Sequence, residues 1–358
     1  MGRLRNPSDA WRFLYCHLIG SVEALDNARV NLFERMFPEK IDESKYASVD
    51  GKVCIVTGAN AGIGLITSKL LAERGAHVIM ACRSKERANE AAKNIRNVSV
   101  KEGCSAPKVD VHELDLASLK SVNGFCDDIM KKKLDLKLIV CNAGLMRPPK
   151  RQETQDGMEM QFQVNYLGHW LLSHRLMSDQ IRRKTKESTR VVMVSSMAHL
   201  GGDIDFEDIH GNKSYDGFLR YADSKLANII GAKEFQRRFD KLDDKKQFRH
   251  TAVSVHPGLI DTRLAREFMK GIMPGIVRPI MDPVNEAFLL PATLRDVEKG
   301  GQSVIAACLA PDDEVSGKYM VYGKVANCAK VASDPEMGRR LWKLSESLTS
   351  LEDIDLLA

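Results

Sequence analysis

The sequence predicts an α/β fold, a doubly wound parallel sheet of about seven strands with helices on both faces. Two observations predict it: from Gly51 onward short apolar runs alternate with longer amphipathic segments, and the first run leads through a Gly-rich turn directly into a helix. The chain has 358 residues, which suits a single large α/β domain with extensions at its ends.

Six apolar runs have the length of strands and lie at residues 53–56, 77–82, 109–114, 138–141, 191–194 and 252–256. The helix-length segments between them include 63–74, 85–97 and 119–131. Strands that alternate with helices pair in parallel through right-handed crossovers. Ligands on such sheets bind at the carboxyl ends of the strands, near the point where the strand order reverses, so we expect the functional residues there.

Residues 1–50 are expected to form a separate extension, an amphipathic helix followed by a linker. Ser8 is a candidate N-cap, and apolar residues then recur at steps of three and four, at Trp11, Leu14, Leu18, Val22 and Leu25. Two interpretations are open: the helix packs on the main domain or on a partner, or it lies in a membrane interface. The main domain is expected at 51–345, and a C-terminal tail at 346–358.

The composition is that of a soluble globular protein, with 44% hydrophobic and 28% charged residues. The net charge of +5 is mild, and aromatic and basic residues do not interleave, so we expect no nucleic-acid binding. Basic runs at 131–133 and 182–184 are either solvated surface or a face attracted to an anionic membrane.

The cysteines indicate a reducing compartment. All eight are scattered without a Cys-x-x-Cys pair, so we expect free thiols, no metal site and no disulfide framework. No run reaches the roughly 18–20 apolar residues that a membrane span needs. Arg12 and His17 interrupt the only apolar patch near the start, so no secretory signal is expected. An intracellular protein is predicted.

The Gly-rich turn lies between the first strand and the first helix of the domain. It reads Thr-Gly-Ala-Asn-Ala-Gly-Ile-Gly over 57–64. Glycines let the backbone turn tightly and approach a pyrophosphate, which the helix N-terminus then attracts. The spacing differs from Gly-x-Gly-x-x-Gly, and a plain loop is the alternative. The position favours a Rossmann-type dinucleotide site formed by Gly58, Asn60, Gly62, Ile63 and Gly64.

The end of the second strand distinguishes the two nicotinamide cofactors. An acidic residue there would bind the ribose 2′-hydroxyl of NAD, whereas an Arg accepts the 2′-phosphate of NADP. The segment 80–85 contains no acid, and Arg83 stands at the expected place, where its guanidinium can make a forked phosphate contact. The alternative is an ordinary surface Arg. The sequence favours NADP(H) over NAD(H).

Tyr221 and Lys225 are the candidate catalytic pair. They are four residues apart in a helical stretch, so they share one face. A free tyrosine has a pKa of about 10, and a nearby ammonium would lower it toward the range of a general base. Ser195 and Ser196 follow the fifth apolar run, where a hydroxyl can bond a substrate oxygen. Asn165 lies on a helix after the fourth run.

Together these motifs resemble the short-chain dehydrogenase/reductase family, and in particular its retinol-dehydrogenase-like group. The resemblance covers about residues 50–345 and includes Leu-Asp-Leu at 114–116, Val-Asn-Tyr-Leu-Gly-His at 164–169, Ser-Ser-Met-Ala-His at 195–199, and Ser-Lys-Leu-Ala-Asn at 224–228. It implies a single Rossmann-type domain that exchanges a hydride between a nicotinamide and an alcohol or carbonyl.

The resemblance also implies roles for individual residues. Ser196, selected over Ser195 by its spacing to the tyrosine, orients the substrate oxygen, Tyr221 moves the proton, and Lys225 holds the ribose. Asn165 anchors a water of the proton relay. Asp115 meets the adenine and Thr262 the carboxamide. The remaining cofactor contacts fall on the turns after the fourth and sixth runs, at Asn142, Ala143, Gly144, Pro257 and Gly258.

Two departures from the family bear on substrate and location. Many relatives carry an N-terminal membrane helix, whereas this chain has only the amphipathic stretch. The segment 264–295, which covers the substrate in this family, is long and apolar. It indicates a retinoid, isoprenoid or steroid-like alcohol or aldehyde, or else ordinary helix packing. The predicted location is the cytoplasm or the surface of the endoplasmic reticulum or a lipid droplet.

The resulting functional hypothesis is an NADP(H)-dependent oxidoreductase. The alternative is a catalytically silent nicotinamide-binding sensor or scaffold, because fold alone does not prove activity. Against it, all four catalytic positions hold competent residues: Asn165, Ser196, Tyr221 and Lys225. Long helices near 154–180 and 219–238 also suggest pairing into a homodimer, as in relatives.

Overall fold

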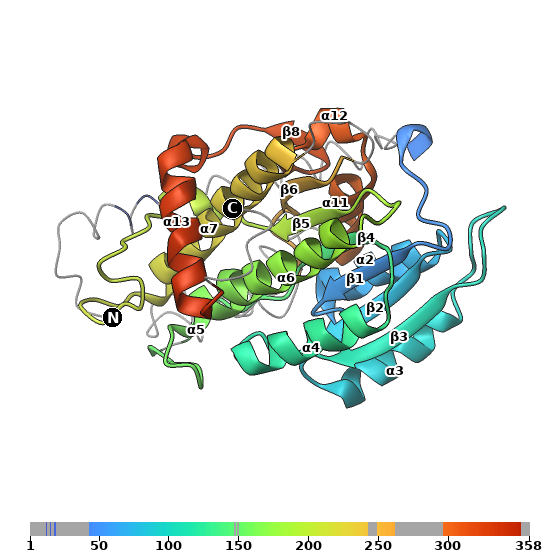
Figure 1. Cartoon of the computed structure of the whole chain (residues 1–358), viewed down its shortest axis with the longest axis horizontal. Coiled ribbons are helices and arrows are strands. Elements are labelled where there is room, and N and C mark those ends of the chain that lie inside the picture. Colours follow the sequence, from blue (N-terminus) through green and yellow to red (C-terminus); the bar gives the residue numbers. More distant parts are fainter. Residues whose placement is uncertain are drawn as a thin grey trace, which may run out of the picture.

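The computed structural model describes residues 12, 15, 18, 43–146, 148, 150–242, 249–261 and 296–351. It has an eight-stranded sheet in the order β3-β2-β1-β4-β5-β6-β7-β8, with helices packed on it (Figure 1). The strands are β1 (Val53–Thr57), β2 (His77–Cys82), β3 (Lys108–Glu113), β4 (Leu136–Cys141), β5 (Arg190–Val194), β6 (Thr251–His256), β7 (Tyr319–Val321) and β8 (Lys324–Ala326).

The predicted fold class is confirmed, and the number of strands is corrected from about seven to eight. All neighbouring strands from β3 to β7 are parallel, and the strand order reverses between β1 and β4. Neither β7 nor β8 is among the six predicted apolar runs. β8 pairs antiparallel with β7 across a turn in which Tyr322 and Gly323 both have positive φ. Lys324 and Val325 are exposed, so this short edge strand has no apolar run to reveal it.

Successive residues of each strand pack on opposite faces of the sheet. In β5, Val191 and Met193 belong to one apolar core and Val192 and Val194 to the other. The first core is completed by α4 (Leu119–Lys131), α6 (Gly168–Arg182), α7 (Gly217–Leu242) and α13 (Pro335–Thr349). The second is completed by α2 (Gly62–Ala72), α3 (Lys85–Arg96) and α11 (Val297–Leu309). Burial on both faces explains why the central strands read as continuous apolar runs.

The structure also has several shorter helical segments. They are α5 (Met160–Phe162), α12 (Asp312–Val315), the π-helical turn η2 (Gln163–Leu167), and the 3₁₀ turns η1 (Glu43–Lys45), η3 (Met197–Gly201) and η5 (Lys330–Ser333). Of these, η3 follows the carboxyl end of β5 directly, and η2 leads into α6.

Helix α13 lies against α7 and contacts α6, the two helices on which a homodimer was predicted (Figure 1). Its Trp342 is 1% exposed and packs edge-on against Trp170 of α6 and Phe235 of α7, with ring centroids 5.1 Å and 4.8 Å apart. The chain's own C-terminal helix therefore covers part of that face. The homodimer stays a prediction.

Of the three described residues in the predicted N-terminal helix, Arg12 contacts the main domain. Arg12, Tyr15 and Leu18 have helical geometry, and the Arg12 guanidinium bonds to the carboxylate of Asp223 in α7 at 2.5 Å. Tyr15 and Leu18 are 50% and 58% exposed. The other residues of the predicted apolar stripe, and the segment 264–295, lie outside the described residues, and the membrane contact stays a prediction.

Among the described residues no helix is both long and apolar enough to cross a membrane. The described histidine, cysteine and acidic side chains also form no group of three or more that is suited to a metal ion.

Candidate active site

The Gly-rich turn joins β1 to α2 with no room for side chains at its centre. A Cβ atom on Gly64 would lie 2.4 Å from the Gly58 carbonyl oxygen and 2.4 Å from Nδ2 of Asn142. The helix N-cap, Ala61, provides no side-chain bond to the first N–H groups of α2, whereas Ser84 caps α3 and Ser118 caps α4. Uncapped N–H groups behind a turn whose Gly64 has no space for a Cβ atom fit a pyrophosphate.

Thr57 and Asn142 join the ends of the two strands that flank the switch point. The Thr57 hydroxyl accepts hydrogen bonds from the backbone N–H groups of Asn142 and Ala143, both at 2.9 Å. The Asn142 side chain donates back to the Thr57 carbonyl at 2.9 Å. Hydrogen bonds therefore hold the turns after β1 and β4, which carry predicted cofactor residues, against each other.

Arg83 follows β2, the neighbour of β1, and is exposed. It forms no ion pair with any residue in the described part of the chain. A guanidinium in this position is free to bind a phosphate. Asp115 lies two residues beyond β3 and is half-buried, and its carboxylate accepts the N–H of Ala117 at 2.9 Å.

Asn165 lies within the π-helical turn η2, an irregularity that often marks functional positions. Its side chain is fixed on three sides: Oδ1 accepts from Leu145 N–H, and Nδ2 donates to the Leu145 carbonyl and to the Ser224 hydroxyl, each at 2.9 Å. A Cβ atom on Gly144 would lie 3.1 Å from Asn165 Oδ1 and 3.6 Å from Lys225 Nζ. The cofactor-side turn and two predicted catalytic residues thus meet at Gly144.

His169 connects Asn165 to Thr57, which begins the Gly-rich turn. Its Nδ1–H donates to the Asn165 carbonyl at 3.0 Å, so Nε2 accepts from the Thr57 hydroxyl at 2.8 Å. Burial lowers the pKa of His169 to about 4, and the ring is therefore neutral near pH 7. The role of this histidine was not foreseen from the sequence.

The two serines after β5 have different environments. Ser195 is 3% exposed, and its hydroxyl donates to the Lys225 carbonyl at 2.7 Å. Ser196 is half-buried, and its Oγ accepts the N–H of Ala198 at 3.2 Å as the cap of η3. Because Oγ accepts from the backbone, its own proton remains for a substrate oxygen, as expected for Ser196 and not for Ser195.

Tyr221 and Lys225 lie in the first third of α7 on one helix face. The Lys225 ammonium is 5.5 Å from the centroid of the Tyr221 ring and donates to the Val194 carbonyl at the end of β5 at 3.0 Å. Burial lowers the pKa of Lys225 to about 8, so it is largely charged at neutral pH. The ammonium is therefore held next to the tyrosine by the sheet itself.

Tyr221 is surrounded by a small apolar cluster that is separate from the two cores. The cluster contains Phe218, Leu219, Ala222 and Ala198, and Met146 packs against it. The Phe218 ring stacks on the Tyr221 ring with centroids 6.4 Å apart. Apolar side chains beside the tyrosine would favour an apolar substrate over a charged one.

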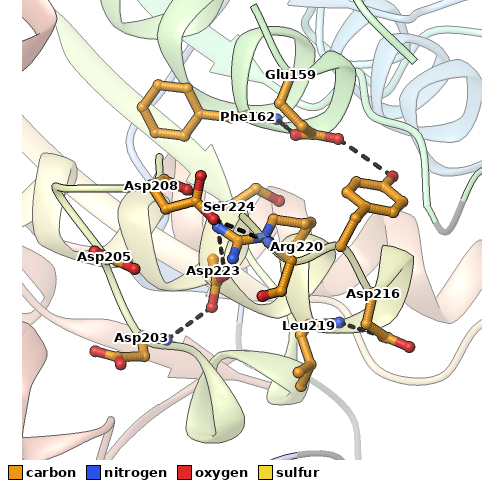
Figure 2. Close-up of polar contacts among 12 residues, drawn as sticks. Glu159, Phe162, Asp203, Asp205, Asp208, Asp216, Leu219, Arg220, Asp223 and Ser224 are labelled. Carbon is orange, nitrogen blue, oxygen red and sulfur yellow. Dashed lines mark hydrogen bonds and ion pairs between the residues drawn. The ribbon is translucent and has the colours of Figure 1, made fainter. Parts of the chain in front are cut away.

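A cluster of charged side chains lies at the start of α7 and in the loop that leads into it (Figure 2). Asp223, inside the Tyr-x-x-x-Lys motif, accepts the Asp203 N–H at 2.8 Å and lies 3.6 Å from Arg220. Arg220 also donates to the Asp208 carbonyl at 3.1 Å, so both residues fix the loop that leads into α7. Burial raises the pKa of Asp223 to about 6, and Arg12 and Arg220 oppose the rise.

We expect Arg220→Met to destabilise the protein more at pH 8 than at pH 5. Removing one partner of a buried ion pair costs about 3 kcal/mol when the remaining charge has no compensation, and the Arg12 guanidinium reduces that cost for Asp223. At pH 8 the Asp223 carboxylate is ionised and loses a cation, whereas at pH 5, below its raised pKa, it holds a proton and needs none. Thermal unfolding at both pH values measures the difference.

Asp223→Asn is the matched background for this test. An amide does not titrate, so Arg220→Met should then cost the same at pH 8 and pH 5. An equal pH dependence in both backgrounds would contradict the assigned coupling between Arg220 and Asp223.

The last predicted contacts follow β6. Pro257 and Gly258 are buried directly after that strand, and Gly258 has a φ of 103°. Thr262 lies outside the described residues. The predicted site residues that the structure describes therefore lie on the turns after β1, β2, β3, β4, β5 and β6 or on the helices α2, η2 and α7.

Comparison with known proteins gives one consistent family. Residues 52–272, which include every predicted site residue, match the family described as short chain dehydrogenase. Retinol dehydrogenase 14 of Mus musculus is 36% identical over 307 residues, covering 84% of this chain and 86% of that protein. Polyprenol dehydrogenase of Mus musculus is 36% identical over 302 residues, covering 84% of each. An uncharacterized protein from Mycobacterium Paratuberculosis has a structure with TM-score 0.66 and 29% identity, covering 87% of this chain and 98% of that one.

Proposed function

Because the chain belongs to the short-chain dehydrogenase/reductase family, we propose that it is an NADP(H)-dependent oxidoreductase acting on an alcohol or carbonyl, with Tyr221 as the acid and base. The observation that carries the proposal is that the predicted cofactor turn and the predicted catalytic residues lie next to each other. Gly144, on the cofactor side, lies against Asn165 and Lys225, and the Lys225 ammonium lies 5.5 Å from the Tyr221 ring.

In the proposed reaction the cofactor transfers the hydride and residues of the protein transfer the proton. The nicotinamide supplies or accepts the hydride. The Ser196 hydroxyl and the Tyr221 hydroxyl donate hydrogen bonds to the substrate oxygen, and Tyr221 gives up its proton as that oxygen becomes an alcohol. Lys225 stabilises the tyrosinate that remains. In the opposite direction Tyr221 takes the proton from the alcohol.

The preference for NADP(H) rests on Arg83. It follows β2, has no carboxylate partner among the described residues, and no acidic side chain occupies 80–85. A 2′-phosphate would give its guanidinium a forked partner.

The proposed substrate is an apolar alcohol or aldehyde of the retinoid, isoprenoid or steroid-like kind. Two relatives at 36% identity are named for retinol and polyprenol. The apolar cluster of Phe218, Leu219 and Met146 beside Tyr221 supports the same class, because burial of apolar substrate against it is favourable.

The proposal is tested by titrating the purified protein with NADPH and with NADH, then adding a panel of long-chain aldehydes and ketones while the reduced-nicotinamide absorbance is followed. We expect tighter binding of NADPH and its consumption with an apolar aldehyde. Binding without consumption across the panel would favour the sensor alternative, and no binding of either cofactor would reject both.

Arg83→Ala should weaken NADPH binding by about 10- to 100-fold, the equivalent of one charge-assisted hydrogen-bonded contact, and leave NADH binding nearly unchanged. Fluorescence titration of both cofactors measures the two affinities. Lys93→Ala is the control, because Lys93 is exposed farther along α3. An equal loss for NADH and NADPH would contradict the assignment of Arg83 to the 2′-phosphate.

A further inference from the structure

His199 is a buried histidine that the proposed chemistry leaves without a role. It lies in η3, three residues after Ser196, and its exposed fraction is 0%. Its contacts are complete, because both ring nitrogens and the backbone N–H have hydrogen-bond partners. A buried ring with every polar group engaged indicates a fixed orientation.

Two of the three contacts go to one atom, the carbonyl oxygen of Ser196. The His199 backbone N–H donates to it at 3.1 Å, and the ring Nδ1 donates at 2.7 Å. A carbonyl oxygen has two lone pairs, so His199 alone satisfies the acceptor capacity of Ser196. The peptide plane that follows Ser196 is thereby fixed, while the Ser196 side chain remains half-buried at the site.

The third contact reaches another part of the chain. Nε2 accepts the N–H of Ala329, which precedes η5, at 3.2 Å. The ring also packs edge-on against Tyr319 of β7, with centroids 4.8 Å apart. His199 therefore joins the serine loop to the C-terminal part of the sheet.

These partners allow a single protonation state. Nδ1 faces a carbonyl and must carry a proton, whereas Nε2 faces an N–H group and must not. A second proton would place two N–H groups against each other. Burial lowers the pKa of His199 to about 4, which agrees with a neutral ring.

We propose that His199 is a positioning residue for the reaction: through the Ser196 carbonyl it holds the Ser196 hydroxyl where the substrate oxygen binds. The role rests on the proposed function. It also agrees with the spacing of three residues between serine and histidine, because a 3₁₀ turn brings the N–H of the third residue onward to the carbonyl.

Three substitutions separate the contacts. His199→Asn keeps a donor near the position of Nδ1, His199→Gln keeps a polar group only near Nε2, and His199→Phe keeps the ring against Tyr319 without either. We expect kcat to fall about 10- to 100-fold in the Phe and Gln variants, as misplacement of a reacting group does. The Asn variant should stay within about threefold of wild type.

Thermal stability separates a positioning role from a purely structural one. If His199 were purely structural, kcat would fall in proportion to Tm across the three variants. All three variants lose a buried contact and should melt lower, so the recovery in His199→Asn should appear in kcat and not in Tm. NADPH affinity should be unchanged in all three. His174→Phe is the control, because this imidazole packs on Trp170 and Trp342 and should change Tm alone.

The outcomes distinguish this role from the proposed function. No turnover by the wild-type protein would reject the function itself. Wild-type turnover with an equally fast His199→Phe variant, or a kcat that follows Tm across the three variants, would reject only the role of His199. Histidine ¹⁵N spectra, independent of activity, should show His199 protonated at Nδ1 alone at pH 7, and protonation at Nε2 would also overturn the role.

Discussion

Tyr221→Phe should reduce turnover by about 10²–10⁴-fold, the contribution of a positioned general acid and base. The substitution removes one oxygen and keeps the ring that stacks on Phe218. We therefore expect NADPH affinity and Tm to remain near wild type. Steady-state turnover with the best aldehyde from the panel, together with NADPH titration and thermal unfolding of the same preparation, measures all three.

Tyr166→Phe is the matched control for the loss of a hydroxyl. Tyr166 is 1% exposed, and its hydroxyl lies 3.0 Å from that of Ser345 in α13. Its removal should lower stability by about 1 kcal/mol and leave turnover unchanged. Turnover that survives in Tyr221→Phe, or that falls equally in both variants, would remove Tyr221 from its proposed role.

Lys225→Met should lower kcat/KM by at least about 10²-fold, because the tyrosinate loses its neighbouring charge and the cofactor ribose loses a charge-assisted donor. The loss should occur without unfolding. Lys225 is 5% exposed, and its partners among the described residues are a carbonyl and a ring. Replacing such a buried ammonium by an apolar side chain of similar length should keep or raise Tm.

The pH dependence gives a second, independent signature of Lys225. Burial lowers its pKa to about 8, so the charge is present below that value and is lost as the pH rises through it. Cofactor affinity of the wild type should weaken between pH 7 and pH 9, whereas Lys225→Met should lack this change. A variant with the same alkaline decline would contradict the assignment, because another group would then be titrating.

Much of the fold follows from apolar periodicity. Strands buried on both faces were predicted to within two residues at each end, as in β2 and β4. The two strands outside the six predicted runs, β7 and β8, are each three residues long. β8 lies at the sheet edge, where its mostly exposed side chains give no apolar pattern. Helix α13 was likewise not predicted, although Asp334 caps it and Pro335 follows at its first position.

The sequence predicted which residues form the site, but not most of the contacts that hold them in place. Asn165 and Lys225 lie together beside Gly144, as their positions after neighbouring strands suggested. Three features needed the structure: the π-helical turn at Asn165, the His169 link to Thr57, and the pairing of Asp223 with Arg12 across 211 positions. Each depends on contacts between distant segments, which periodicity and local spacing do not encode.

The most direct test of the central claim follows the hydride itself. Wild-type protein is incubated with NADPH deuterated at the transferred position of C4 and a long-chain apolar aldehyde, and the product is analysed by mass spectrometry. The account predicts an alcohol with one deuterium on the carbinol carbon, and almost none formed by Tyr221→Phe under the same conditions. An alcohol without deuterium, or no product from a protein that binds NADPH across the whole aldehyde panel, would contradict it.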